Sequence, residues 1–458
     1  MSSFLSDEGE QEVADVLAYI ANESSVLEER IGETSEGLDT LLESSTLFLA
    51  ERGISIDASA DDIAEDEEID VVVIPTWDQL LAEAHMEVGM GHSLDELFTK
   101  RELAEQDRVV RDLNDAYKEV HRLDKTDMAI CVSAGLIAAA VDLIFVGVPH
   151  RGPEGLEARP LGDYVRKHFE NAFPPEEMEK LASLPGAKVP YDAPYNTNFT
   201  TVDVEGLWPT MHRLYSLGHD PLLGFAVGVH DILTGQMTTI DKNGVFVVQK
   251  IERYVGREEC AVFAAICKQV LHFKTDINTS MGLPAPLMGL FNLLQFGNIG
   301  EDNLTIAEIV QGMYYEGYDF IHFCAQTIPV IIAEVIVRLL YFAKRVHEGC
   351  SPKDSIPFST NRDSHPKLAT MLFIAHSIAT AVDAGRVLFT KNPMEISYPQ
   401  WVMFATYSFK QAKWVLISKP QAQHQYVMQS IDDELQAVIE EIDRSFDSLA
   451  DEYRVVSL

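Results

Sequence analysis

The feature that most limits what this chain can fold into is a series of long apolar segments in its middle. The clearest are residues 128–149, 320–343, 368–385 and 401–418. Each approaches the roughly 20 residues that a helix needs to cross the hydrocarbon layer of a membrane. A further uncharged segment, residues 277–300, is interrupted by glycines and prolines, which break helices. We therefore expect a hydrophobic, mainly α-helical body over residues 128–420.

Ionisable side chains interrupt nearly all of these segments. The candidates for buried polar or cavity-lining positions are Asp142, His322, Glu334 and Arg338. An ion at the centre of a bilayer costs at least about 2.5–3.5 kcal/mol, so these helices would be poor independent spans. Glu334 and Arg338 are four residues apart and could neutralise each other on one helix face. The segments fit either a membrane assembly with a polar interior or the core of a large soluble α-domain.

The charge of the chain is concentrated at its ends. The net charge is −37, and residues 1–80 hold 22 acidic side chains but only two basic ones. Residues 425–458 hold nine acidic side chains and two basic ones. Binding to a nucleic-acid backbone needs a positive footprint, so we expect no duplex nucleic acid as a partner. The basic side chains of residues 94–125 alternate with acidic ones, which is typical of a solvated helix face rather than an anion-binding patch.

The two acidic ends have the pattern of coiled-coil helices. Between residues 10 and 51, apolar residues recur at spacings of three, four and seven, which predicts one long helix with a heptad-like seam. The residues proposed for restraint and oligomerisation are Leu17, Ile20, Leu27 and Ile31. Residues 427–453 have a similar seam, so a homo-oligomer is expected. An ordinary amphipathic helix lying on its own domain fits the N-terminal pattern equally well.

These observations predict four consecutive regions. They are an acidic N-terminal helix (1–56), an acidic linker with a polar helical region (57–127), the hydrophobic body (128–420) and an acidic C-terminal helix (421–458). Inside the second region, residues 71–74 are expected to be extended, and Thr76 and Gln79 have the spacing of a helix capping box. In the body, Gly224 and Gly228 have the spacing of close helix packing, and residues 241–244 predict a β-hairpin. The expected fold is mainly α with this minor hairpin.

No catalytic motif of a common enzyme class is present, and we predict neither an enzyme nor a bound cofactor. The most enzyme-like string is Gly218-His219-Asp220-Pro221, with a second His-Asp pair at His230 and Asp231. His-Asp doublets bind divalent ions in HD-type phosphohydrolases, which makes His219 and Asp220 weak metal candidates. Asp220 before a proline also has the pattern of a helix cap, and this interpretation is favoured.

Three segments resemble those of a poorly characterised family of bacterial proteins. They are ICVSAGLIAAAVDLIFVGVP (130–149), LGHDPLLGFAVGVHDILTG (217–235) and FNLLQFGNIG (291–300). They are also similar to the membrane effectors of Hailong-type antiphage systems, and the similarity covers about residues 125–420. The resemblance implies an oligomeric ion channel, held closed by an oligonucleotide that a partner nucleotidyltransferase makes and opened during infection. It carries over no functional residue.

We therefore expect an oligomeric, membrane-associated effector that its N-terminal helix restrains. The first residues, Met1 to Glu8, lack the basic and apolar regions of a signal peptide, so a cytoplasmic or inner-membrane protein is expected rather than a secreted one. The expected partners are other copies of the chain, a membrane, and a nucleotidyltransferase with its oligonucleotide product. A soluble helical binding or scaffold protein and an HD-like metal-dependent phosphohydrolase are the two alternatives.

Overall fold

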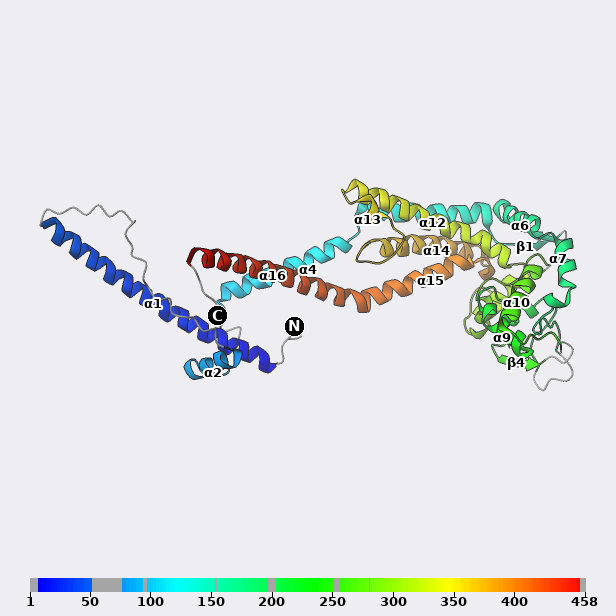
Figure 1. Ribbon diagram of the computed structural model, residues 1–458. Helices are drawn as coiled ribbons and strands as arrows, with labels where there is room; N and C mark the ends of the chain where they lie inside the picture. The colour runs from blue at the N-terminus through cyan, green and yellow to red at the C-terminus, as the bar shows by residue number, and fades with distance from the viewer. Residues whose placement is uncertain are drawn as a thin grey trace. The chain divides into compact units, whose positions relative to one another are not determined.

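The computed structural model describes residues 7–51, 76–93, 97–152, 155–196, 203–250, 256–279 and 281–453 (Figure 1). They fall into two units, one made from residues up to Glu119 together with those from Gln421 onward, the other from Val120–Pro420. The chain is mainly α-helical, as the sequence predicts. Its described strands form two short antiparallel hairpins, where the sequence predicts one. The segment expected to be extended at 71–74 lies outside the described residues.

The first unit consists of long, polar helices. These are α1 (Asp7–Glu51), α2 (Trp77–Glu87), α4 (Lys100–His121) and most of α16 (Lys419–Tyr453). The capping box at the start of α2 is confirmed, because the Thr76 N–H donates to Gln79 Oε1 at 2.9 Å. The start of α1 packs on α2, where the buried carboxylate of Asp15 accepts the backbone N–H groups of Gly91 and His92.

The seam predicted on α1 is exposed in this unit. Leu17, Ile20, Leu27 and Ile31 all present large apolar side chains to the surface, as do several apolar residues of α16. A heptad seam buries its apolar residues only when a second helix lies along it. Within the described part of the chain, α1 therefore has a docked end beside α2 and a long apolar stripe beyond it.

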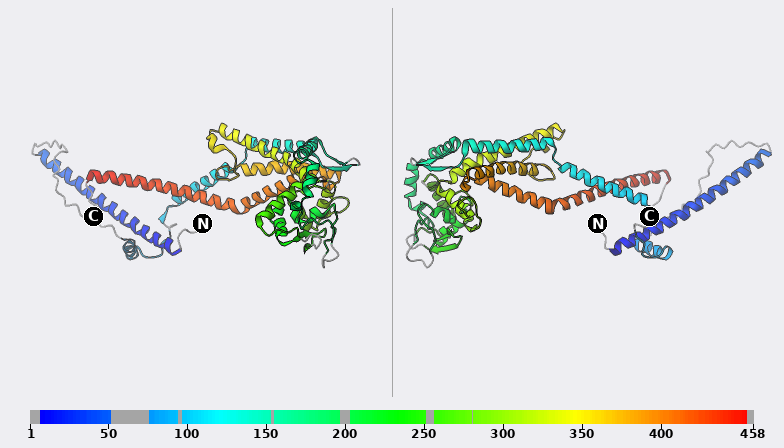
Figure 2. Two further views of the ribbon diagram at one scale, coloured as in Figure 1. Left: turned by 45° about the vertical axis from the view of Figure 1, so that its right-hand side comes forward. Right: turned by 180° about the vertical axis from the view of Figure 1, so that it is seen from behind.

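The second unit contains a bundle of four long helices, seen in Figure 1 and, from behind, in Figure 2. They are α5 (Lys125–Val141), α12 (Phe320–His347), α14 (Leu368–Thr390) and α15 (Tyr398–Lys413), and the short α13 (Pro352–Ser355) follows α12. A π-helical turn extends α5 over Asp142–Val146, and another, Trp414–Ser418, follows α15. The buried core of the bundle is made mostly of small and aliphatic residues of α5, α12 and α14. The predicted apolar segments thus form the helices of one bundle.

Gly135 lets two bundle helices approach closely. A Cβ atom at this position of α5 would lie 2.5 Å from the backbone oxygen of Ala375 in α14. That distance is too short for any real Cβ contact, so the α5–α14 packing requires glycine here. Small residues permit this kind of contact in both soluble and membrane helix pairs.

Residues 147–319, which we call the insert, lie between the bundle helices α5 and α12. Figure 1 shows α7, α9, α10 and β4 gathered at one end of the bundle. The elements are β1 (His150–Gly152), β2 (Gly155–Glu157), α6 (Pro160–Ala172), α7 (Pro175–Ala182), α8 (His212–Tyr215), α9 (Val227–Thr234), β3 (Gln236–Ile240), β4 (Phe246–Lys250), α10 (Val262–Asp276) and α11 (Ile306–Tyr315). Strands β3 and β4 are the predicted hairpin. Among the described residues of the uncharged segment 277–300, the short 3-10 helix Met288–Leu293 is the only helical element, as the glycines and prolines of this segment predict.

Polar contacts attach the insert to the bundle. Arg166 of α6 donates to both carboxylate oxygens of Asp319, at 2.9 and 2.8 Å, and Asp319 caps the start of α12. His322 Nε2 and Gln326 Nε2 of α12 both lie 3.1 Å from the carbonyl oxygen of Gly147, just after α5. His322, predicted as a buried polar or cavity-lining residue, is a buried side chain that links two chain segments.

Candidate functional site

Among the residues that the structure describes, three helical segments are long and apolar enough to cross a membrane. The segments with this property are Lys100–Val146, Phe320–His347 and Leu368–Thr390, which contain α5, α12 and α14. Only 44%, 44% and 50% of their most apolar stretches are buried inside the protein. About half of each stretch therefore faces outward.

The predicted pair of Glu334 and Arg338 is partly buried, with the Glu334 side chain 18% and the Arg338 side chain 25% exposed. Arg338 Nε donates to Glu334 Oε2 at 2.7 Å, and the hydroxyl of Tyr407 donates to Glu334 Oε1. His376, fully buried in α14, places its Nε2 atom 3.4 Å from the same carboxylate. The charge of Glu334 is thus compensated by groups from three helices, as a buried carboxylate requires.

A second polar group surrounds Asp142 at the end of α5. Arg386 of α14 donates to Asp142 Oδ2 at 3.0 Å and also to Asp383. Asp383 additionally accepts the indole N–H of Trp401 at 2.7 Å. Asp142 and Asp383 line a cavity of about 10 Å³, room for roughly one water molecule. Among the described residues, Asp142 Oδ1 has no hydrogen-bond partner, so this cavity has one unsatisfied acceptor in its wall.

Another cavity in the bundle lies at the other end of α12. Its volume is about 330 Å³. Its charged lining residues are Asp127, Lys344, Arg345, Glu348, Asp363 and Lys367. Three cations face three carboxylates, and Lys344 is already paired with two carboxylates of the α5 start. The lining therefore has no positive excess that would favour a phosphate-bearing ligand.

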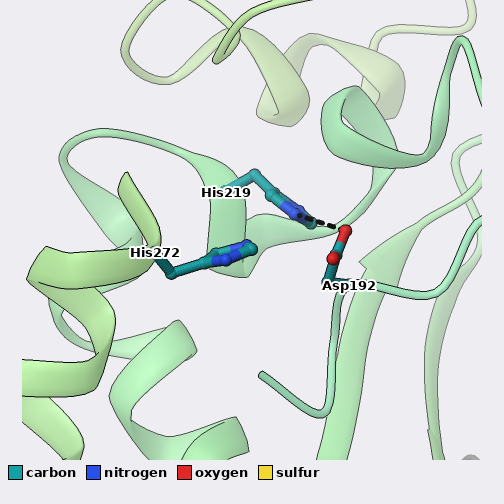
Figure 3. Close-up of side chains that lie close together, drawn as sticks. All are labelled: Asp192, His219 and His272. Carbon is teal, nitrogen blue, oxygen red and sulfur yellow. Dashed lines mark ion pairs between the residues drawn. The ribbon is translucent and has the colours of Figure 1, made fainter. Parts of the chain in front are cut away.

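In the described part of the insert, three histidines and two aspartates lie close together, and Figure 3 shows three of these residues, Asp192, His219 and His272. We call Asp192, His212, His219, His272 and Asp276 the histidine cluster. His212 begins α8, His219 ends the 3-10 helix Leu217–His219, and Asp192 lies in the loop before them. His272 and Asp276 are one turn apart on α10, so they share a face of that helix.

The ligand-type atoms of this cluster lie close together. One nitrogen or oxygen atom from each of Asp192, His219 and His272 falls within 4.8 Å of the others. His219 Nε2 lies 3.5 Å from Asp192 Oδ1 and 3.7 Å from Asp276 Oδ2. The His272 and His219 side chains are almost completely buried, whereas the Asp192 side chain is 33% exposed. The cluster is therefore a buried group with one member reaching the surface.

Burial and the neighbouring charges set the ionisation of the cluster. Burial lowers the pKa of His219 to about 4, although the nearby carboxylate of Asp192 opposes the shift. Burial disfavours the charged form of Asp192, but the neighbouring imidazoles of His212, His219 and His272 outweigh it and hold the pKa of this carboxyl well below its usual range. At neutral pH His219 is therefore a neutral imidazole beside an ionised carboxylate.

Tight packing holds the cluster from one side. The ring of Tyr191 makes edge-on contacts with His219 and His272, at centroid distances of 4.9 and 5.5 Å. Its hydroxyl donates to Gln269 Oε1 at 2.6 Å, and Gln269 Nε2 donates to the Gly218 carbonyl at 2.8 Å. A Cβ atom on Gly218 would lie 2.7 Å from the Tyr191 ring, so glycine is needed beside His219.

The structure separates the two weak metal candidates of the sequence. His219 belongs to the cluster, whereas Asp220 accepts the backbone N–H groups of Leu222 and Leu223 at 2.9 and 2.8 Å and so holds the turn before the 3-10 helix Leu223–Phe225, whose own N-cap is Leu222. The second doublet lies elsewhere, because Asp231 bonds to Thr238. The alternative of an HD-like phosphohydrolase thus lacks the adjacent histidine and aspartate that together bind the metal in that class of enzyme. Sequence reasoning missed Asp192, His272 and Asp276, of which only the four-residue spacing on α10 gave a signal.

Comparison with known proteins identifies no relative. No family model matches the chain, and neither a curated protein nor a solved structure is similar to it.

Proposed function

We propose that this chain is a membrane-embedded, oligomeric effector whose bundle helices α5, α12 and α14 lie in the bilayer. The observation that carries the proposal is the distribution of side chains around the bundle. The outward residues include Val132, Leu136 and Ile137 of α5 and Ile331, Val335 and Leu339 of α12. The inward residues include Ala134, Ala138, Gln326, Ala333, Ala375 and His376.

This distribution is the one that a bilayer favours. Exposed apolar area costs about 25 cal/mol per Å² in water, whereas lipid imposes no such cost on it. Ile331, Val335 and Leu339 are spaced by four residues and form an outward stripe along α12, with Leu339 61% exposed. Polar side chains in membrane helices face the bundle interior and pair with one another, as Glu334 does with Arg338. The soluble-scaffold alternative leaves the stripe in contact with water.

A lysine placed on this stripe separates the two possibilities. We expect Val335→Lys to reduce the fraction of protein that stays in the membrane pellet after a carbonate wash, because lysine near a bilayer centre costs about 2.5–3.5 kcal/mol. Tyr164→Lys, at an exposed position of the insert, is the matched control and should leave the fraction unchanged. A wild-type chain that is monodisperse without detergent, together with a harmless Val335→Lys change, would overturn the proposal.

Self-association through α1 is the second part of the proposal. The exposed seam of Leu17, Ile20, Leu27 and Ile31 has the heptad spacing that a second copy of the same helix would complement. Leu27→Asp should lower the mass measured by light scattering in detergent, whereas Ser25→Asp adds the same charge beside the seam and should not. Equal masses for both variants would argue that α1 only lies on its own unit.

Ion conduction and gating complete the proposal. The polar interior around Glu334 and Asp142 supplies groups that an ion path requires, and the resemblance to Hailong-type effectors suggests an oligonucleotide as the closing ligand and a nucleotidyltransferase as its source. The test is ion flux from liposomes that contain the purified chain. Leu27→Asp should increase flux if the N-terminal helix restrains the body, and should decrease it if that helix only holds the oligomer together. Absence of flux in every variant, with or without short oligonucleotides, would reduce the function to membrane association alone.

A further inference from the structure

We propose that Asp192, His219 and His272 bind one divalent transition-metal ion of the zinc class. The site belongs to the insert and does not depend on whether the bundle lies in a membrane. Its ligand atoms converge within 4.8 Å of one another, and the two imidazoles come from different elements that pack around Tyr191. Figure 3 shows both rings and the carboxylate directed toward a common space.

The separations between the polar atoms fit a coordination shell. Zinc binds imidazole nitrogen and carboxylate oxygen at about 2.0–2.2 Å, so neighbouring ligands of a tetrahedral ion lie roughly 3.3–3.6 Å apart. The distance between two of the proposed ligands, from His219 Nε2 to Asp192 Oδ1, is 3.5 Å, and the ligand atom of His272 lies within 4.8 Å of both. Hydrogen bonds between such groups are shorter, about 2.7–3.2 Å. His219 and Asp192 are therefore spaced as neighbours around an ion.

The backbone fixes which nitrogen of His272 faces the cluster as a lone pair. His272 Nδ1 lies 3.1 Å from the carbonyl oxygen of Ala187, which can only accept, so Nδ1 carries the proton. A neutral imidazole has one ring proton, and Nε2 is then an acceptor directed at Asp276, another acceptor. His212 Nδ1 also lies 2.9 Å from a backbone carbonyl, that of Pro209, but its Nε2 lies at hydrogen-bond distance from Asp192 Oδ1. A histidine held by a backbone carbonyl in this way is typical of metal ligands.

Unsatisfied buried atoms give the second line of evidence. Within the described residues, both ring nitrogens of His219 and Nε2 of His272 lack a hydrogen-bond partner. His219 is completely buried and His272 is 3% exposed. Buried polar atoms are nearly always satisfied in folded proteins, so several such atoms in one place call for an explanation. One cation placed among them would satisfy the lone pairs of Asp192, His219 and His272 together.

The remaining members of the cluster act as positioning residues. His212 Nε2 lies 3.1 Å from Asp192 Oδ1 and orients that carboxylate. Asp276 is held by Arg213, whose Nε atom lies 3.0 Å from Asp276 Oδ2. Two imidazoles and one carboxylate suit zinc and its neighbours, whereas magnesium and calcium prefer oxygen ligands alone. The exposed part of Asp192 leaves room for a solvent ligand in a fourth position.

The test is metal binding by the purified full chain in detergent. After treatment with a chelator, the wild type should take up about one equivalent of Zn²⁺ or Co²⁺ per chain, with visible absorption bands from the bound Co²⁺. Asp192→Asn, which keeps the side-chain shape, should weaken Co²⁺ binding at least tenfold, and His272→Gln should weaken it similarly. Asp203→Asn and His168→Ala, exposed residues of the insert outside the cluster, should bind as the wild type does.

The outcomes are distinguishable even if one variant fails to fold, because circular dichroism reports helix content and the wild type is informative alone. A folded wild type that binds neither ion overturns the proposal. Binding that Asp192→Asn and His272→Gln both leave unchanged places the ion elsewhere and overturns it as well. Binding by the wild type and both controls, but not by the two folded ligand variants, supports it.

Discussion

Replacing Gly135 with alanine tests the close packing of α5 against α14. The added Cβ atom would lie 2.5 Å from the backbone oxygen of Ala375 and 2.9 Å from Cβ of Ile378. Ordinary contacts begin near 3.4 Å, so the helices would have to separate by up to about 1 Å. Overpacking of this kind costs about 1–3 kcal/mol.

Alanine at position 135 also stabilises the helix locally, and this contribution must be subtracted from the measured change in unfolding free energy. Alanine is favoured over glycine inside a helix by about 1 kcal/mol, whatever the surroundings. Gly385 of α14 is the matched reference, because a Cβ atom there meets nothing within 4 Å. Gly385→Ala should therefore be stabilising by about 0.5–1 kcal/mol. The difference between the two variants isolates the packing cost of about 1–3 kcal/mol at Gly135.

Thermal unfolding of the full chain in detergent measures this difference. With an unfolding entropy of about 2.1 cal/mol/K per residue, a cooperative unit of roughly 300 residues changes its Tm by about 1.6 °C per kcal/mol. Gly135→Ala should thus unfold about 2–5 °C below Gly385→Ala. If both variants raise Tm equally, the two helices do not approach closely at Gly135, and the described packing of the bundle is wrong there.

Two other contacts give further predictions. Glu334→Gln should lower the free energy of unfolding by about 1–3 kcal/mol, because Arg338 loses its ionised partner in a partly buried position. Thermal unfolding measures this loss, and Glu348→Gln, at an exposed position of the same ion-pair type, is the control. Asp15→Ala should speed hydrogen exchange at the amides of residues 91 and 92 by about 10–150-fold, because a hydrogen bond to a charged acceptor contributes about 1.5–3 kcal/mol and the variant lacks that acceptor. Asp39→Ala, at an exposed position of α1, should leave the exchange unchanged. Unchanged exchange in Asp15→Ala would mean that α1 is not docked there.

The helices could be predicted because their signals are local. The heptad spacing of residues 10–51 and the capping box at Thr76 depend on neighbours within one or two turns, and both predict the observed elements. The β3–β4 hairpin is equally local, because Asp241 accepts the N–H groups of Asn243 and Val245 and Gly244 adopts a positive φ of 80°. Turn and capping chemistry of this kind is contained in a few consecutive residues.

The polar interior of the bundle was predictable only in part. A four-residue spacing indicated the Glu334–Arg338 pair, since both residues lie on one helix. The partners that compensate Glu334 from other helices, Tyr407 and His376, depend on how three helices pack. The partner of Asp142 could not be predicted from spacing either, because Arg386 is 244 residues away in the sequence. Spacing can thus identify a charged residue on an apolar helix without identifying its neighbours across the bundle.

The histidine cluster could not be predicted for the same reason, because its members come from distant segments of the chain. The glycines that support it were visible in the sequence, but their role was not. Gly224 and Gly228 have a spacing that is typical of close helix packing, and the sequence offered no more specific reason for them. In the structure a Cβ atom on either glycine would lie within 2.8 Å of the Gln269 side chain. Gln269 in turn bonds to Tyr191, the ring on which His219 and His272 pack. These glycines therefore support the candidate metal ligands through α10, so a substitution at Gly228 should disturb metal binding without touching a ligand.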